Sequence, residues 1–166
     1  MKRFWIPLML CGVLATGDLA GGAQPAVAPM AGDLKAMLES LRSDVNGFKV
    51  RLLNDVMGLS NVEADKFWPI YREYEKEMAA LGDRRVEVIR EFLALQEAGR
   101  MDDASWESIA RRSIANAESR LQLWKRYHKK IAKAVSPKRA AQFLQVEHQI
   151  ALFVDLSIAS EMPLAQ

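Results

Sequence analysis

Cysteine is nearly absent from the 166-residue chain, in which Cys11 is the single copy. One cysteine excludes an internal disulfide framework and a zinc site built from several cysteines. A strong excess of one charge is also lacking, because 23 lysines and arginines stand against 21 aspartates and glutamates, a formal net charge of +2. So small a net charge does not indicate a dedicated nucleic-acid-binding protein.

Motifs that carry catalysis are missing as well. The chain has no glycine-rich phosphate loop, and no serine is placed with a histidine and an acid as in a catalytic triad. No alternation of β-branched residues with hairpin turns predicts a sheet. The sequence therefore predicts an all-α protein that is not an enzyme and uses no cofactor.

Residues 1–23 have the layout of a secretory signal peptide. The basic pair Lys2-Arg3 precedes an apolar run at 4–15, and this run of about 12 residues is too short for a membrane-spanning helix. Small residues then allow cleavage near Ala23. We therefore expect a protein of the bacterial periplasm with no integral membrane segment after cleavage.

Cys11 lies within the signal segment and makes a lipoprotein the alternative to a cleaved signal peptide. The bulky Leu10 immediately before it disfavours that alternative.

The rest of the chain divides into a leader, one domain and a tail. Residues 24–32 are rich in Ala and Pro and are typical of a flexible leader. We expect a single helical domain at 33–162 and a short tail at 163–166.

Apolar residues recur at helical spacing from Asp33 onward. They predict four long antiparallel helices, arranged as helical hairpins, at about 34–57, 61–98, 104–135 and 137–160. Each helix has an apolar stripe expected to face the core. The stripes include Phe48, Leu52 and Val56 in the first helix, Phe67, Tyr71 and Tyr74 in the second, Leu121, Trp124, His128 and Ile131 in the third, and Phe143, Ile150 and Ile158 in the fourth. An antiparallel dimer would cover apolar residues that the shorter outer helices leave exposed, namely Phe92, Leu95, Trp106 and Ile109.

The starts of the second and fourth predicted helices resemble each other. Ser60 and Glu63 form a capping box, and Ser136 caps the fourth helix ahead of a proline. Residues 59–67 align with residues 135–143, at an offset of 76, with an apolar residue, Ser, Ala and Phe at equal positions. The match predicts a duplicated helical hairpin.

This repeated pattern, apolar-Ser-x-x-x-Ala-x-x-Phe, resembles the paired LTxxQ motifs of the Spy/CpxP group of small periplasmic helical proteins. The resemblance spans residues 59 to about 153, and Glu63 and Arg139 stand where the family prefers Gln. It implies an antiparallel helical hairpin fold, often dimeric. The roles it implies are holding unfolded proteins, damping an envelope-stress sensor or, in some relatives, binding metal.

Basic residues crowd the third predicted helix and are the candidate client-binding surface: Arg111, Arg112, Arg120, Arg126, Lys129, Lys130 and Lys133. Acidic residues near the start of the second helix could lie alongside and neutralise them: Glu63, Asp65, Glu73, Glu75 and Glu77. The alternative to a binding surface is an ordinary solvated helix face.

A metal site is the weaker alternative for the remaining polar residues. Antiparallel packing would bring His128 near Glu147 and His148, a two-histidine, one-carboxylate set. The competing interpretation pairs His128 with Glu147 or a tyrosine and leaves His148 in solvent. Arg85 and Glu147 also fall on apolar stripes. They should lie roughly 20 Å apart, too far to pair with each other. We therefore expect each of them in a less buried part of the bundle.

Three functions follow from these observations. The first is a periplasmic binding protein that holds unfolded envelope proteins or senses envelope stress. The second is a metal-responsive sensor or scavenger. The third is a structural interaction protein with one dedicated partner.

Overall fold

The computed structural model describes residues 47–163. These residues form a helical segment at 47–57 and then the helices α2 (Asn61–Glu97), α3 (Asp103–Ala134) and α4 (Pro137–Glu161). The described range contains no strand. The all-α fold class predicted from the sequence is confirmed.

Several sequence predictions fall outside this range. The signal peptide (1–23), the leader (24–32), the first part of the first predicted helix (34–46) and the last three residues (164–166) lie outside the described residues. None of the described helices combines the length and the apolar character that a membrane span requires.

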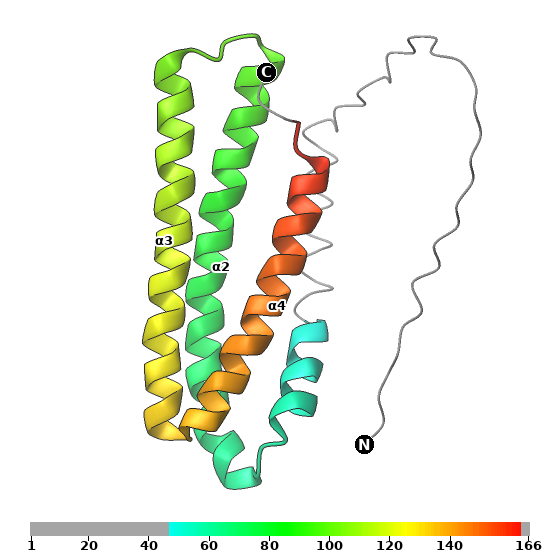
Figure 1. The fold of residues 1–166 in the computed structure, drawn as a ribbon, viewed down its shortest axis with the longest axis vertical. Helices are drawn as coiled ribbons and strands as arrows, with labels where there is room; N and C mark the ends of the chain where they lie inside the picture. Colours follow the sequence, from blue (N-terminus) through cyan, green and yellow to red (C-terminus); the bar gives the residue numbers. More distant parts are fainter. Residues whose placement is uncertain (1–46, 164–166) are drawn as a thin grey trace, which may run out of the picture.

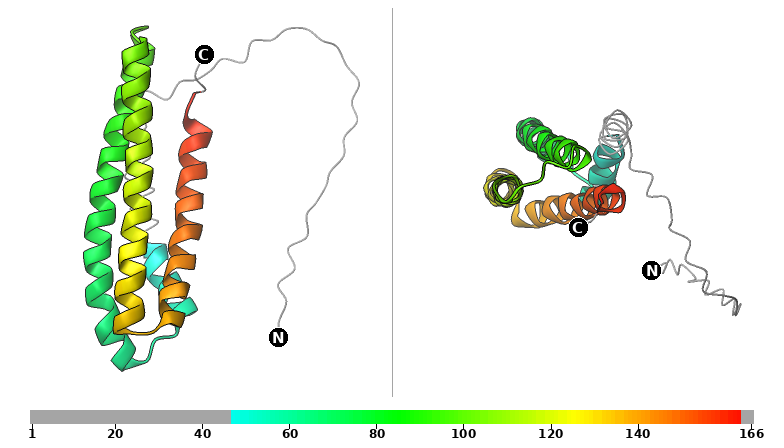
Figure 2. Two further views of the ribbon diagram at one scale, coloured as in Figure 1. Left: turned by 60° about the vertical axis from the view of Figure 1, so that its left-hand side comes forward. Right: turned by 90° about the horizontal axis from the view of Figure 1, so that it is seen from above.

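The helices lie along one long axis (Figure 1). α2 and α3 run side by side in opposite directions, and α4 begins beside the end of α3 and diverges from it (Figures 1 and 2). The segment 47–57 lies on the side of the bundle away from α3 (Figure 2). The end that holds the α3–α4 turn is therefore closed by four helical elements.

Side-chain capping sets the helix starts at the predicted places. The Ser60 and Glu63 capping box is formed in full, with the Ser60 amide donating to Glu63 at 2.9 Å. Asp102 accepts from the Ser105 amide at 2.8 Å, and Ser136 caps α4 with Pro137 in its first turn. These hydrogen bonds satisfy backbone donors that have no partner within the helix.

Two glycines mark the ends of helical segments. Gly58 follows the segment 47–57 with φ of 52°, and Gly99 follows α2 with φ of 61°. A side chain would be strained in this left-handed conformation, which is why glycine ends helices so often.

The core is concentrated at the closed end of the bundle. The most deeply buried large side chains come from all four elements: Leu53, Met57, Phe67, Tyr74, Ile131, Phe143 and Val146. A second, smaller cluster at the other end joins Ile89 of α2 to Ile158 of α4. The main core therefore holds the helices together from the end at which α4 begins.

Two of the predicted stripes are wrong by one residue. In the segment 47–57 the buried row is Lys49, Leu53 and Met57, whereas Phe48 and Val56 are 52% and 38% exposed. In α3 the predicted Ile131 is buried, but the other buried residues are Leu123 and Tyr127, whereas Leu121 is exposed and Trp124 and His128 are half-buried. One residue rotates a helix face by about 100°, so a neighbouring row of side chains faces the core in each case.

The stripe proposed for a dimer contact is also more covered than expected. Phe92 is buried within the chain and packs its ring against Trp106, with centroids 5.8 Å apart. Leu95, Trp106 and Ile109 are half-buried. These residues are therefore not the large exposed apolar face of the described chain.

Candidate functional site

A buried polar network joins all four helical elements. Its members are Lys49 from the segment 47–57, Tyr74 and Glu75 from α2, Trp124 from α3, and Glu147 from α4. The Tyr74 hydroxyl donates to Glu147 Oε2 at 2.5 Å and accepts from Trp124 Nε1 at 3.1 Å. Lys49 Nζ lies 3.1 Å from the same Glu147 oxygen and 2.6 Å from Glu75 Oε1.

Burial controls the electrostatics of this network. Burial raises the pKa of Glu147 above that of an ordinary carboxyl, although Lys49 and Tyr74 favour its charged form. Burial also opposes the charge of Lys49, but the carboxylates of Glu147 and Glu75 outweigh it and raise the pKa of Lys49. The network therefore keeps a lysine charged inside the core.

Glu147 was expected in a less buried part of the bundle, and that prediction is wrong. Its side chain is 3% exposed, and the Lys49 side chain is 6% exposed. Arg85, 35% exposed, instead pairs with Asp155 at 2.5 Å. Charged partners make burial of Glu147 tolerable, and the sequence pattern of α4 alone does not reveal them.

The three residues of the metal alternative are not assembled as a metal site. Glu147 is committed to Tyr74 and Lys49, whereas His148 is exposed and packs edge-on against Trp124, with centroids 5.7 Å apart. His128 is half-buried on α3. Among residues 47–163, no group of three His, Cys, Asp or Glu side chains could hold a metal ion.

The seven basic candidates on α3 divide into two groups. Four pair with carboxylates, and the pairs are Arg112 with Glu91, Arg120 with Asp155, Arg126 with Glu77 and Lys130 with Glu73. Arg111, Lys129 and Lys133 are exposed and make no ion pair within the described range. The expected neutralisation by α2 is thus present at Glu73 and Glu77, and three cations stay available to solvent.

A cluster of exposed apolar side chains lies on α4. Leu152, Phe153 and Leu156 are 55%, 58% and 70% exposed. Residues three and four apart are neighbours on a helix surface, and Leu156 is three residues from Phe153 and four from Leu152, so the three side chains form one patch, called here the α4 apolar face. No lysine or arginine follows Arg139 in α4. Large apolar groups grouped on a surface are typical of interaction sites.

Sequence reasoning did not identify this face. The α4 stripe was assigned to the inward row, of which Phe143, Ile150 and Ile158 are indeed buried. The signal was available, because α4 carries three large apolar residues outside that row. Such a surplus on one helix indicates a second apolar face.

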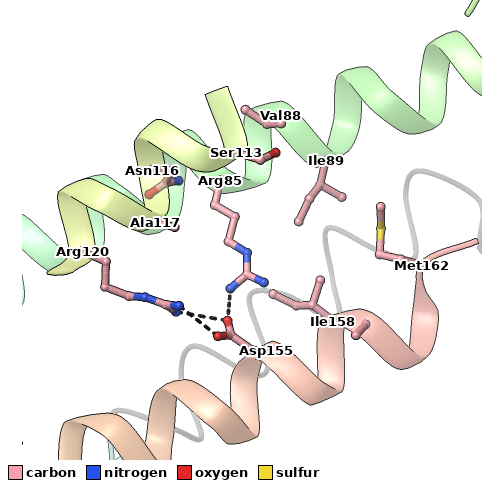
Figure 3. Close-up of a pocket in the computed structure, with 11 residues that line it drawn as sticks. Arg85, Val88, Ile89, Ser113, Asn116, Ala117, Arg120, Asp155, Ile158 and Met162 are labelled. Carbon is pink, nitrogen blue, oxygen red and sulfur yellow. Dashed lines mark hydrogen bonds and ion pairs between the residues drawn. The ribbon is translucent and has the colours of Figure 1, made fainter. Parts of the chain in front are cut away.

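A pocket of about 400 Å³ opens between α2, α3 and α4. At one side of it, Arg85 of α2 and Arg120 of α3 converge on Asp155 of α4 (Figure 3). Arg120 binds both Asp155 oxygens at 3.0 and 3.1 Å, while Arg85 Nη1 donates to one of them. Although burial opposes the charge of Asp155, these arginines lower the pKa of the carboxyl.

The rest of the pocket wall is mostly apolar or small. It is formed by Val88, Ile89, Ser113, Asn116, Ala117, Ile158, Ala159 and Met162. The small side chains on α3 and the divergence of α4 leave this space unfilled (Figures 1 and 3).

Searches against protein-family models, curated proteins and solved structures find no match.

Proposed function

We propose that the protein is a non-enzymatic binding protein that holds exposed apolar segments of unfolded polypeptides. The observation that carries this proposal is the α4 apolar face, whose three large side chains are each more than half exposed. Burying such side chains against a client is favourable by about 25 cal/mol for each Å² removed from water. The resemblance to the Spy/CpxP group adds support from the sequence.

The free cations of α3 contribute attraction at longer range. Arg111, Lys129 and Lys133 are exposed without a carboxylate partner in the described part of the chain. Unneutralised charges raise the rate of encounter with acidic segments more than the final affinity. We therefore propose that the α4 apolar face provides most of the affinity for a client, and that these cations raise the rate at which the protein encounters it.

Suppression of client aggregation tests this function. The triple variant Leu152→Ser, Phe153→Ser, Leu156→Ser should fold normally, because the altered side chains are exposed, but should lose most of its protection of a denatured client. The matched control is Ile114→Ser on α3, which removes an isolated side chain that is 61% exposed. Equal protection by the triple variant and the parent would refute the proposal. Protection restricted to one native partner would favour the dedicated-partner function.

We also propose that the protein acts in the periplasm after cleavage near Ala23. The support is the order of basic, apolar and small residues in 1–23. Mass spectrometry of the protein from an envelope fraction should find an N-terminus near Gln24. Recovery of the chain from the cytosol with Met1 intact would contradict this location.

A further inference from the structure

The pocket between α2, α3 and α4 has an unequal charge balance. Two guanidinium groups, from Arg85 and Arg120, face the single carboxylate of Asp155. Arg120 uses two nitrogens on that carboxylate, whereas Arg85 donates only through Nη1. The Nε and Nη2 groups of Arg85 make no hydrogen bond within residues 47–163. One positive charge with free donors is left at the pocket.

The pocket wall beyond the arginines is suited to hydrocarbon. Val88, Ile89 and Ile158 are between 6% and 8% exposed, so they form a nearly closed apolar floor. Figure 3 shows Met162 next to this floor, on the side away from Arg120. A cation at one end and an apolar floor at the other fit a ligand with one anionic group and a hydrocarbon chain.

We propose that this pocket binds a hydrophobic monocarboxylate, a medium-chain fatty acid being the chemical class that fits. The carboxylate would accept hydrogen bonds from Arg85, and the chain would lie on Val88, Ile89 and Ile158. A volume of about 400 Å³ is near the lower end of the range for small-molecule sites, which favours a short chain. The pocket shares no residue with the α4 apolar face, so this inference does not depend on the proposed function.

Calorimetric titration of the purified protein with sodium octanoate and sodium decanoate tests the site. We expect one molecule bound per chain. Each additional buried methylene should tighten binding about fourfold, so decanoate, with two more methylenes, should bind about fifteenfold more tightly than octanoate. The alcohol 1-octanol should bind at least tenfold more weakly than octanoate, because it lacks the charge that Arg85 recognises.

Two pairs of variants locate the ligand. Arg85→Gln should weaken decanoate binding about tenfold, and Asp155 keeps its bidentate partner Arg120, so the fold is preserved. Arg90→Gln, an exposed arginine on the same helix, is the matched control. Ala117→Leu should abolish binding by filling the pocket, whereas Ala115→Leu on the solvent side of α3 should not. Circular dichroism verifies that each variant is folded.

Three outcomes would overturn the proposal. Absence of binding by the parent protein would mean that the pocket does not take a hydrophobic carboxylate. Equal affinity for octanoate and 1-octanol would mean that the arginine does not select a carboxylate. Binding unchanged in both Arg85→Gln and Ala117→Leu would place the ligand elsewhere.

Discussion

Glu63 and Arg139 occupy equivalent positions in the two halves of the sequence repeat and contact each other. Arg139 Nε donates to Glu63 Oε1 at 3.0 Å, and Nη2 donates to Oε2 at 3.1 Å. The two residues are 76 apart, which is the offset of the repeat. Where the Spy/CpxP pattern prefers glutamine twice, this chain has a bidentate ion pair between the starts of α2 and α4.

A second pair of equivalent residues makes the same kind of contact. Phe67 and Phe143, also matched by the repeat, have ring centroids 6.3 Å apart in an edge-to-face arrangement. Equivalent residues meet each other where the axis that relates two repeated units passes close to them. Both contacts are what a duplicated hairpin would produce if such an axis passed between the starts of α2 and α4.

Arg139→Gln should lower the melting temperature by several degrees. The guanidinium also donates to the backbone oxygens of Met57 and Gly58, at 3.0 Å in the case of Gly58. Loss of the side chain therefore releases the end of the segment 47–57 as well as Glu63. Lys138→Gln, a neighbouring exposed residue, is the control for the charge change. A variant as stable as the control would show that this contact contributes nothing.

The Glu63–Arg139 pair should also be visible in the pH dependence of stability. The hydrogen bond from Arg139, followed by that from the Ser60 amide, lowers the pKa of Glu63 to about 2. A lowered pKa in the folded state contributes stability that is present above the ordinary carboxyl pKa and is lost as pH falls toward 2. Glu63→Gln preserves the capping box. Its deficit in urea denaturation should be largest near neutral pH and should shrink between pH 4.5 and pH 2. A deficit that is constant across this range would contradict the assignment.

Removal of the buried lysine should be costly. Lys49→Met leaves Glu147 in the core without its cationic partner, and breaking a buried pair from one side costs about 3–5 kcal/mol. The double variant Lys49→Met, Glu147→Gln should recover much of that stability, because glutamine is neutral and still accepts from Tyr74. Chemical denaturation of the parent, both single variants and the double variant measures the coupling. Additive effects would mean that Lys49 and Glu147 act independently.

Charge reversal on α3 should have two different effects. Arg126→Glu with Lys130→Glu places carboxylates against Glu77 and Glu73, so we expect a loss of stability; each exposed pair contributes about 0.2–1 kcal/mol. Lys129→Glu with Lys133→Glu should lower the melting temperature less, because neither lysine pairs with a carboxylate in the described range, but should slow client capture.

Salt provides the control for this second pair of substitutions. Raising ionic strength from 0.1 to 1 M shortens the Debye length from ~10 to ~3 Å, so it should slow capture by the parent in the same way. Capture by the Lys129, Lys133 variant at the parent's rate in low salt would make this surface an ordinary solvated helix face.

Local sequence chemistry was sufficient to predict the helix boundaries. Ser60 and Ser136 cap helices where expected, because a side-chain oxygen before an apolar row satisfies nearby amides whatever the rest of the chain does. The buried row of α2, which includes Phe67, Tyr71 and Tyr74, was predicted for a similar reason. Its aromatic residues have no competing apolar row beside them.

Where two apolar rows run side by side, periodicity could not decide between them. The segment 47–57 offers Phe48, Leu52 and Val56 or Lys49, Leu53 and Met57, and a lysine is ordinarily the residue left in water. Lys49 faces inward because Glu75 and Glu147 neutralise it from elements distant in the sequence. The α4 apolar face and the pocket likewise depend on how α4 is oriented against α2 and α3.

The concentration of the core at one end has a consequence for hydrogen exchange. Most of the deeply buried side chains gather beside the α3–α4 turn, whereas the cluster at the diverging end has only Ile89 and Ile158 as buried members within residues 47–163. Local opening requires least free energy where few apolar contacts must be broken. Amide protons near Phe143 should therefore exchange slowest, and protection should decline along α4 toward Glu161. The diverging half can then open and admit a ligand while the other half stays folded.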